Sequence, residues 1–160
     1  MEYTDLIADF ARRTVQNLDH VQEQELRGNA DVFPVTQLWN SLLGLIVLPR
    51  ERDMGRIPSS PMTQLWSQGW PRLTTAGTEH GTLHDFVNGL RNAVAHFNVE
   101  FIAGSNREIT SVKVWNQKYS RGKPTPDSKR WEGRITIEEL DRLARLMAHL
   151  YVEKFASAAA

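Results

Sequence analysis

The sequence contains no cysteine among its 160 residues, so disulfide bonds and thiolate metal ligands are excluded. An intracellular setting is the simpler interpretation of that absence. Net charge is also absent, because 19 basic residues balance 19 acidic ones, and the total gives no sign of electrostatic binding to DNA or to a membrane. The longest dense apolar run, residues 38–48, is well short of the ~20 residues that span a bilayer. The first residues are acidic where a secretory signal is basic, and we expect a cytoplasmic protein without a membrane segment.

Four segments have the apolar spacing of amphipathic or buried helices. They are residues 4–26, 34–48, 82–97 and 137–155. Thr82 is suited to cap the third of these helices, and Thr136 with Glu139 forms a capping box for the fourth.

The remaining segments contain turn residues and short β-branched stretches. Residues 49–81 are rich in proline and glycine and predict a long irregular connection. Alternating β-branched residues within 98–135 predict a hairpin insertion of two or three strands, with a polar loop at 117–128. The predicted fold is therefore mainly α and a single domain over residues 1–160. It is a helical bundle of four main helices with a small β-hairpin before the last helix.

Small and polar residues form a narrow stripe along the second predicted helix. They recur at three- and four-residue steps and are Thr36, Gln37, Asn40, Ser41 and Gly44. Such a stripe permits a neighbouring helix to approach closely. The alternative is that it forms one wall of a polar site.

The third predicted helix has a complete apolar face and a separate polar face. The apolar arc consists of Leu83, Phe86, Val87, Leu90, Ala93, Val94 and Phe97. On the polar face, Asn92 lies one turn before His96, whereas Arg91 is about 140° around the helix from His96. Either these side chains curl toward Asn92, or a second copy of the helix supplies the missing partner across a two-fold axis. Gly89 and Ala95 favour the second option, because small residues let two helices approach closely.

An arginine and a histidine on one polar face suit phosphodiester cleavage without a metal. The imidazole of His96 can take a proton from a ribose 2′-hydroxyl or give one to the leaving 5′-oxygen. The guanidinium of Arg91 stays charged and can bind phosphate oxygens as negative charge develops, and Asn92 can orient either group. The alternative is a solvated face that ends in a histidine, a residue type that the helix dipole favours at this end.

The segment LRNAVAH, with Arg91, Asn92 and His96, resembles the R-x(4–6)-H signature of the HEPN superfamily. Together, the blocks FPVTQLWNSLLGLIVLPRE and LRNAVAHFNVEF resemble one prokaryotic branch, the HEPN family nucleases. The resemblance implies a helical bundle that dimerises and, in active members, cleaves RNA without a metal in a cleft between two protomers. It also implies that Arg91 and His96 are catalytic and that Asn92 assists them. In many members paired with an antitoxin, a tyrosine two places after the histidine accepts adenylylation; Asn98 stands there in this chain, so that control is not expected.

A basic segment is a second candidate for contact with RNA. Residues 107–134 hold eight basic and three acidic residues. Within it, cationic and aromatic side chains alternate in a pattern that suits phosphate contacts and base stacking on single-stranded RNA. The candidate RNA-binding residues are Lys118, Tyr119, Arg121 and Lys123. The alternative is a solvated hairpin loop.

These features predict a homodimeric HEPN ribonuclease, a toxin or defence effector that acts on RNA and has an antitoxin or other protein as a further partner. His80 and His84 are four residues apart, but no carboxylate follows at the spacing of a zinc site, so no metal and no cofactor are expected. Two alternatives are open. A non-catalytic HEPN module would bind a nucleotide, an RNA or a protein through the same face. A purely structural interaction domain would leave Gly89, Arg91 and His96 exposed and far from any cleft.

Overall fold

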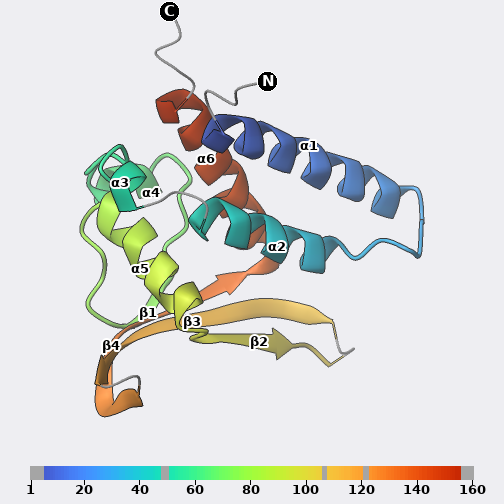
Figure 1. The fold of residues 1–160 in the computed structure, drawn as a ribbon. Coiled ribbons are helices and arrows are strands. Elements are labelled where there is room, and N and C mark those ends of the chain that lie inside the picture. Colours follow the sequence, from blue (N-terminus) through green and yellow to red (C-terminus); the bar gives the residue numbers. More distant parts are fainter. Residues whose placement is uncertain (1–5, 48–50, 106–107, 121–122, 156–160) are drawn as a thin grey trace, which may run out of the picture. The chain divides into compact units, whose positions relative to one another are not determined.

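The computed structural model describes residues 6–47, 51–105, 108–120 and 123–155, with the backbone path alone for residues 51–52, 118–120, 123–124 and 126–129. Along these residues, four helices precede the first strand, a fifth helix follows it, and the other three strands come before the last helix; the strands form one four-stranded sheet (Figure 1). The contacts between residues divide the chain into two compact units. One unit is Met1–Ile57 with Leu140–Ala160, and the other is Pro58–Glu139.

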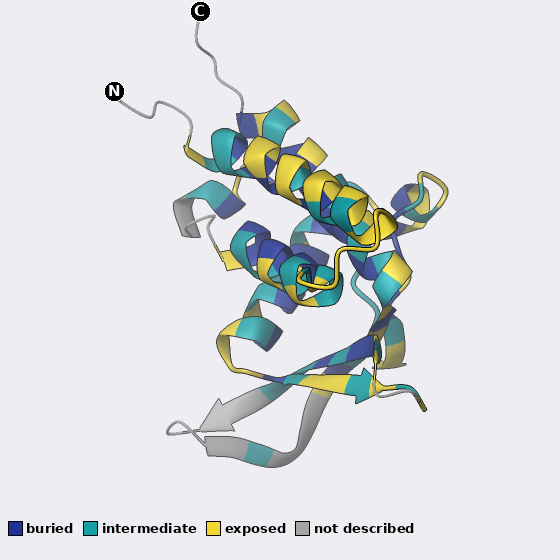
Figure 2. Cartoon of the chain, turned by 90° about the vertical axis from the view of Figure 1, so that its right-hand side faces the viewer, coloured by how far each residue is buried: buried dark blue, intermediate teal, exposed yellow. Residues whose placement is uncertain are grey.

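The first unit is helical. It contains α1 (Leu6–Leu26), α2 (Pro34–Val47), the short α3 (Glu51–Met54) and most of α6 (Ile137–Phe155). Buried residues recur every three or four positions along the long helices, as expected for amphipathic helices, and the colours of Figure 2 alternate accordingly. The buried residues of α6 include Leu140, Leu143, Ala144, Met147, Leu150 and Tyr151.

The small-residue stripe of α2 is used for close helix packing. A Cβ atom at Gly44 would overlap the ring of Phe10 from α1, with Cε1 at 2.9 Å. The ring therefore occupies the space that a side chain at position 44 would need. In the same stripe, Nε2 of Gln37 donates a hydrogen bond to Oγ of Ser41 at 3.4 Å. These contacts support the packing interpretation of the stripe rather than a polar site.

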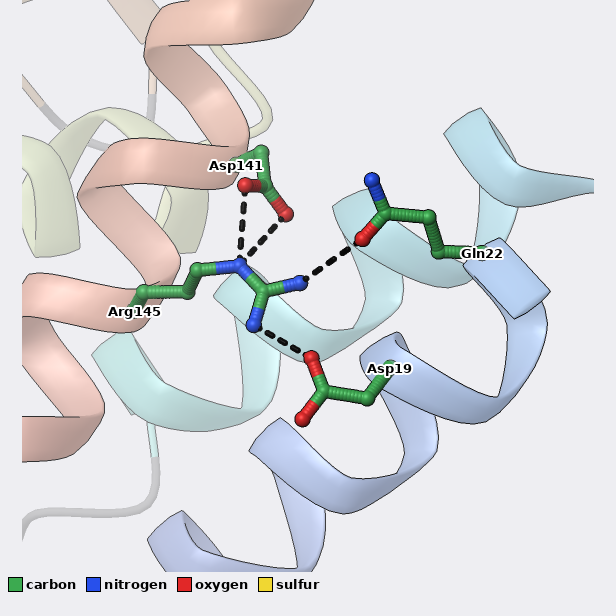
Figure 3. Close-up of polar contacts among 4 residues, drawn as sticks. All are labelled: Asp19, Gln22, Asp141 and Arg145. Carbon is green, nitrogen blue, oxygen red and sulfur yellow. Dashed lines mark hydrogen bonds and ion pairs between the residues drawn. The ribbon is translucent and has the colours of Figure 1, made fainter. Parts of the chain in front are cut away.

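An ion-pair network joins α6 to α1 (Figure 3). Arg145 donates from Nε to both carboxylate oxygens of Asp141, at 3.1 and 2.9 Å. It also donates from Nη1 to Asp19 of α1 at 2.6 Å and from Nη2 to Gln22 at 3.5 Å. Burial lowers the pKa of Arg145, but the hydrogen bonds to Asp141 and Asp19 outweigh that effect and raise the pKa above its ordinary value.

The second unit is built on an antiparallel sheet. Its strands are β1 (Thr74–Gly77), β2 (Val99–Ala103), β3 (Ile109–Ser120) and β4 (Lys123–Thr136), in the spatial order β1-β4-β3-β2. The unit also contains α4 (Met62–Trp66) and α5 (Leu83–Ala95), and α5 packs against β3. Asn116 of β3 ties the helix to the sheet, because its Nδ2 donates to the carbonyl oxygen of Gly89 at 2.8 Å.

The helix starts predicted from capping residues are confirmed. Oγ1 of Thr82 accepts a hydrogen bond from the amide of Asp85 at 3.2 Å and so caps α5. At α6, the amide of Thr136 donates to the Glu139 carboxylate at 2.9 Å, and the amide of Glu139 donates to Oγ1 of Thr136 at 3.2 Å. These two reciprocal bonds are the capping box.

Helix α5 ends in a Schellman motif with a phenylalanine where glycine is usual. The amide of Asn98 donates to the carbonyl of Ala93 at 2.8 Å, and the amide of Phe97 donates to that of Val94 at 2.9 Å. Phe97 has a φ of 57°, in the left-handed region, which costs a residue with a side chain about 1–2 kcal/mol. The prediction that Phe97 belongs to the apolar face is wrong, since the residue is 89% exposed. The left-handed residue turns the chain off the helix before the ring can join the core.

The predicted mainly α bundle is wrong as well, because the chain is mixed α/β with a four-stranded antiparallel sheet. Residues 74–77 of the expected irregular connection form β1 and pair with β4, although TTAG has no apolar alternation. The expected polar loop at 117–128 continues β3 and β4, with Tyr119 opposite Pro124. Strand pairing satisfies backbone N–H and C=O groups and needs no apolar side chains, so these segments carry little sequence signal. The expected small hairpin is therefore three strands of a larger sheet.

Candidate functional site

A groove of about 1080 Å³ opens in the second unit, lined by α5, β3, β4 and the segment between β1 and α5. Most of the side chains in its wall are polar. From the helix and its end come Asp85, Asn88, Gly89, Asn92 and His96; from the strands come Asn116, Gln117, Arg130 and Trp131; and residues 77–81 complete it.

The helical residues of the groove form one stripe at three- and four-residue steps. Asn92 and His96 belong to this stripe, and both are exposed. His96 is the C-cap of α5, and its amide donates to the carbonyl of Asn92 at 3.2 Å. Arg91 is half-buried and is not one of the described residues that line the groove, as its angle of about 140° from His96 requires. The structure thus brings Asn92 and His96 together and places Arg91 on another side of the helix.

His80 forms part of the groove wall directly over Gly89. A Cβ atom at position 89 would overlap the imidazole, with Cε1 at 2.5 Å, so only glycine permits this approach. The imidazole lies against Trp131 and Phe86, at centroid distances of 4.8 and 6.2 Å. Its Nε2 is buried and has no hydrogen-bond partner among the described residues. Burial therefore lowers the pKa of His80, although the charges of Asp85 and Glu79 oppose the shift.

Gly89 consequently has a different role from the one expected. Its small size favoured an approach between two copies of this helix, but Gly89 is buried beneath His80 and Asn116 of the same chain. The space is filled within the unit. Ala95, the other small residue of that face, is exposed.

The acidic groups of the groove have partners within the chain. Glu79 accepts two hydrogen bonds from Arg72, at 2.9 and 3.0 Å, and the Arg72 guanidinium lies 4.7 Å from the ring centre of Trp66. Asp85 accepts a hydrogen bond from Oγ1 of Thr82 at 2.7 Å. These partners reduce the repulsion that free carboxylates would exert on a bound anion. The basic side chains among the described groove residues are Arg130 and the imidazoles of His80 and His96.

The model of one known family covers almost the whole chain. It is described as HEPN pEK499 p136 and matches residues 1–157. The chain belongs to this HEPN family. The superfamily expected from LRNAVAH is therefore confirmed, while membership of the HEPN family nuclease branch stays a prediction. Among curated proteins and solved structures, none matches the chain significantly.

In this HEPN chain, Asn98 is held inside the second unit. The residue is only 4% exposed. Its carbonyl accepts a hydrogen bond from the amide of Trp115 at 3.2 Å, and its amide closes the Schellman motif. Position 98 therefore offers no exposed side chain at the end of α5.

The HEPN groove also contains residues that the sequence reading did not select. Arg130 of β4 is exposed and adds a guanidinium, while Asn116 and Gln117 of β3 add two amides. One signal was available for Asn116. Every second residue of a strand points to the same face of the sheet, so Asn116 shares a face with Val112 and Val114, which are 0% and 1% exposed. A polar residue on the buried face of a strand usually has a hydrogen-bond partner.

The structure describes the side chains of none of the four candidate RNA-binding residues. Lys118, Tyr119 and Lys123 are placed in β3 and β4 by their backbone alone, and Arg121 lies outside the described residues. RNA binding by this segment stays a prediction. Within the described ranges, no three His, Asp or Glu side chains gather as a metal site would require. None of the helices in the described part of the chain combines the length and apolarity that a bilayer crossing demands.

Proposed function

We propose that this HEPN chain is a metal-independent endoribonuclease that acts in the cytoplasm as a toxin or defence effector. His96 serves as the general acid or base, Arg91 stabilises the charged phosphate, and Asn92 orients the imidazole or the phosphate. The observation that carries the proposal is the placement of Asn92 and His96 in one exposed stripe along a polar groove. RNA is the substrate, and an antitoxin is a further partner.

The proposed reaction needs no group beyond side chains and the RNA itself. His96 removes the proton of a ribose 2′-hydroxyl, the 2′-oxygen attacks phosphorus, and the bond to the 5′-oxygen breaks. The products are a 2′,3′-cyclic phosphate and a 5′-hydroxyl, whose proton comes from an imidazolium or from water. Because the attacked phosphate gains negative charge, a guanidinium that donates two hydrogen bonds to it lowers the barrier.

The separation of Arg91 from the groove supports a site shared between two chains. A guanidinium about 140° around the helix from His96 does not face the same phosphate from one isolated helix. In a two-fold dimer, the same surface of each copy forms the contact. The guanidinium of Arg91 from one copy would then face the groove that contains His96 of the other copy. Since Gly89 is covered within the chain, exposed Ala95 is the small residue of that face that stays available to the second copy.

The first test replaces His96 with alanine and measures RNA cleavage in the presence of EDTA. Loss of general acid–base catalysis should lower the cleavage rate by about 10²- to 10⁴-fold. His149→Ala is the matched control, because His149 is an exposed helical histidine in the other unit. Full activity of His96→Ala, or complete loss of wild-type activity in EDTA, would contradict the mechanism.

The second test asks whether the site is shared. Arg91→Ala and His96→Ala chains are each inactive under the proposal, but a mixed dimer combines the intact Arg91 of one chain with the intact His96 of the other. Random mixing in equal amounts makes half the dimers mixed, each with one intact site of two, so about a quarter of wild-type activity should return. No recovery on mixing would show that the two residues act within one chain. Tight RNA binding without product, even by the wild type, would instead support a non-catalytic HEPN module.

A further inference from the structure

Phe97 is unusual in both its backbone and its side chain. Its φ of 57° is the left-handed conformation of a Schellman C′ residue, which glycine adopts without strain. The residue is 89% exposed, so the chain gains almost no burial from its ring. A large aromatic residue that is strained and unburied contributes nothing evident to folding, and this points to a contact outside the chain.

The position of Phe97 indicates what that contact is. It directly follows His96, so the two Cα atoms are about 3.8 Å apart, and His96 lines the polar groove. The next residue, Asn98, fills the interior position of the motif at 4% exposure, which leaves the Phe97 ring on the outside. A ligand whose phosphate reaches His96 therefore presents its adjacent base to the rim where the Phe97 ring stands.

We infer that Phe97 is a base-stacking residue for single-stranded RNA, holding the nucleobase next to the phosphate at His96. This inference rests on the proposed function. A single exposed ring offers one flat apolar surface, which matches one base and is tolerant of its identity. The neighbouring groove is lined by the amides of Asn92 and Asn116 and by Arg130, a polar setting that suits a nucleotide better than an apolar protein surface.

The test is a double-mutant cycle between Phe97 and the base. RNA binding is measured on a His96→Ala background, so that substrate is not consumed, with a short single-stranded oligonucleotide and with versions that carry an abasic site at each position in turn. Phe97→Gly should weaken binding of the intact oligonucleotide about ten-fold. The same substitution should have almost no effect for the abasic oligonucleotide that lacks the stacked base, and Phe97→Tyr should retain binding.

Misfolding does not explain the expected loss, because Phe97→Gly removes backbone strain and should leave the Tm unchanged or higher. Phe33→Ala is the matched control, since Phe33 is 71% exposed but does not adjoin a groove residue in the sequence. An equal loss with intact and every abasic RNA would overturn the inference. So would a shift of the chain from dimer to monomer in sedimentation on Phe97→Gly, which would assign the ring to a protein interface.

Failure of the stacking inference is distinguishable from failure of the proposed function. Cleavage by the wild type with no base-dependent effect of Phe97 would overturn stacking alone. A base-dependent effect of Phe97 in a chain that never cleaves RNA would support stacking and refute the nuclease.

Discussion

Replacement of Gly89 by alanine should destabilise the chain only while His80 is present. A Cβ atom at position 89 would overlap the imidazole, with Cε1 of His80 at 2.5 Å and Nδ2 of Asn116 at 3.4 Å. The imidazole has little room to move, because Phe86 and Trp131 lie against it at centroid distances of 6.2 and 4.8 Å. The methyl group of alanine must therefore displace packed atoms.

Two opposing effects set the magnitude. Forcing a methyl group into a packed site costs about 1–3 kcal/mol, whereas alanine is favoured over glycine inside a helix by about 1 kcal/mol. Gly89→Ala should thus lower the free energy of unfolding by about 1 kcal/mol. In a His80→Ala background the clash is gone, and the same substitution should raise that free energy by up to about 1 kcal/mol. The coupling between the two positions is then about 2 kcal/mol.

Urea unfolding followed by tryptophan fluorescence measures this coupling, since four of the five tryptophans lie in the second unit. Gly55→Ala is the control, because a Cβ atom there meets nothing within 4 Å, and its effect should stay within about 0.5 kcal/mol. If Gly89→Ala stabilises the wild type as much as the His80→Ala chain, the imidazole does not occupy the space above Gly89 and the reasoning is refuted.

Three further perturbations test the remaining contacts. Burial holds the pKa of His80 below its usual 6.5. The unfolded state therefore binds more protons as the pH falls below that value, and stability decreases. His80→Gln should flatten the fall in Tm between about pH 6.5 and 5, and an unchanged fall would contradict this assignment. Arg145→Met removes the network that joins α6 to Asp19 of α1. In urea unfolding it should lower the free energy of unfolding by about 1 kcal/mol at low salt and by less in 1 M NaCl. An equal loss at both salt concentrations would contradict an ionic origin. Thr136→Ala should lower the free energy of unfolding by about 1 kcal/mol, whereas Thr136→Ser should lower it much less because serine keeps the capping oxygen. Equal losses for both substitutions would exclude the capping box as the cause.

The four long helices were predictable to within a few residues because their signals are local, whereas α3 and α4 lie in the segment expected to be irregular. Thr82 accepts the capping bond expected of it, and Thr136 with Glu139 forms both bonds of the capping box. Apolar spacing likewise identified the buried face of α6. Each of these signals depends on residues no more than a few positions apart, so the local sequence is enough to predict these helices.

The sheet was predicted only in part. Val112 and Val114 are buried on either side of half-buried Lys113, and the alternation of β-branched residues indicated β3. The four residues of β1 have no such pattern, and three of them are exposed. Their partner, β4, lies more than fifty residues away in the sequence, with Thr74 opposite Gly133. Pairing between distant backbones leaves no mark on the side chains of a short edge strand, so the mixed α/β fold was not predictable from periodicity.

By itself, the sequence determined that Asn92 and His96 share a helix face, that Arg91 does not, and that the chain carries the HEPN motif. These conclusions follow from the 3.6-residue repeat of a helix and from residue identity. Only the tertiary structure decided that His80 covers Gly89 and that Arg130 of β4 joins the same groove. The physical reason is that a helix face specifies which side chains point outward, whereas the group that fills the space in front of it comes from segments whose approach depends on the packing of the whole unit.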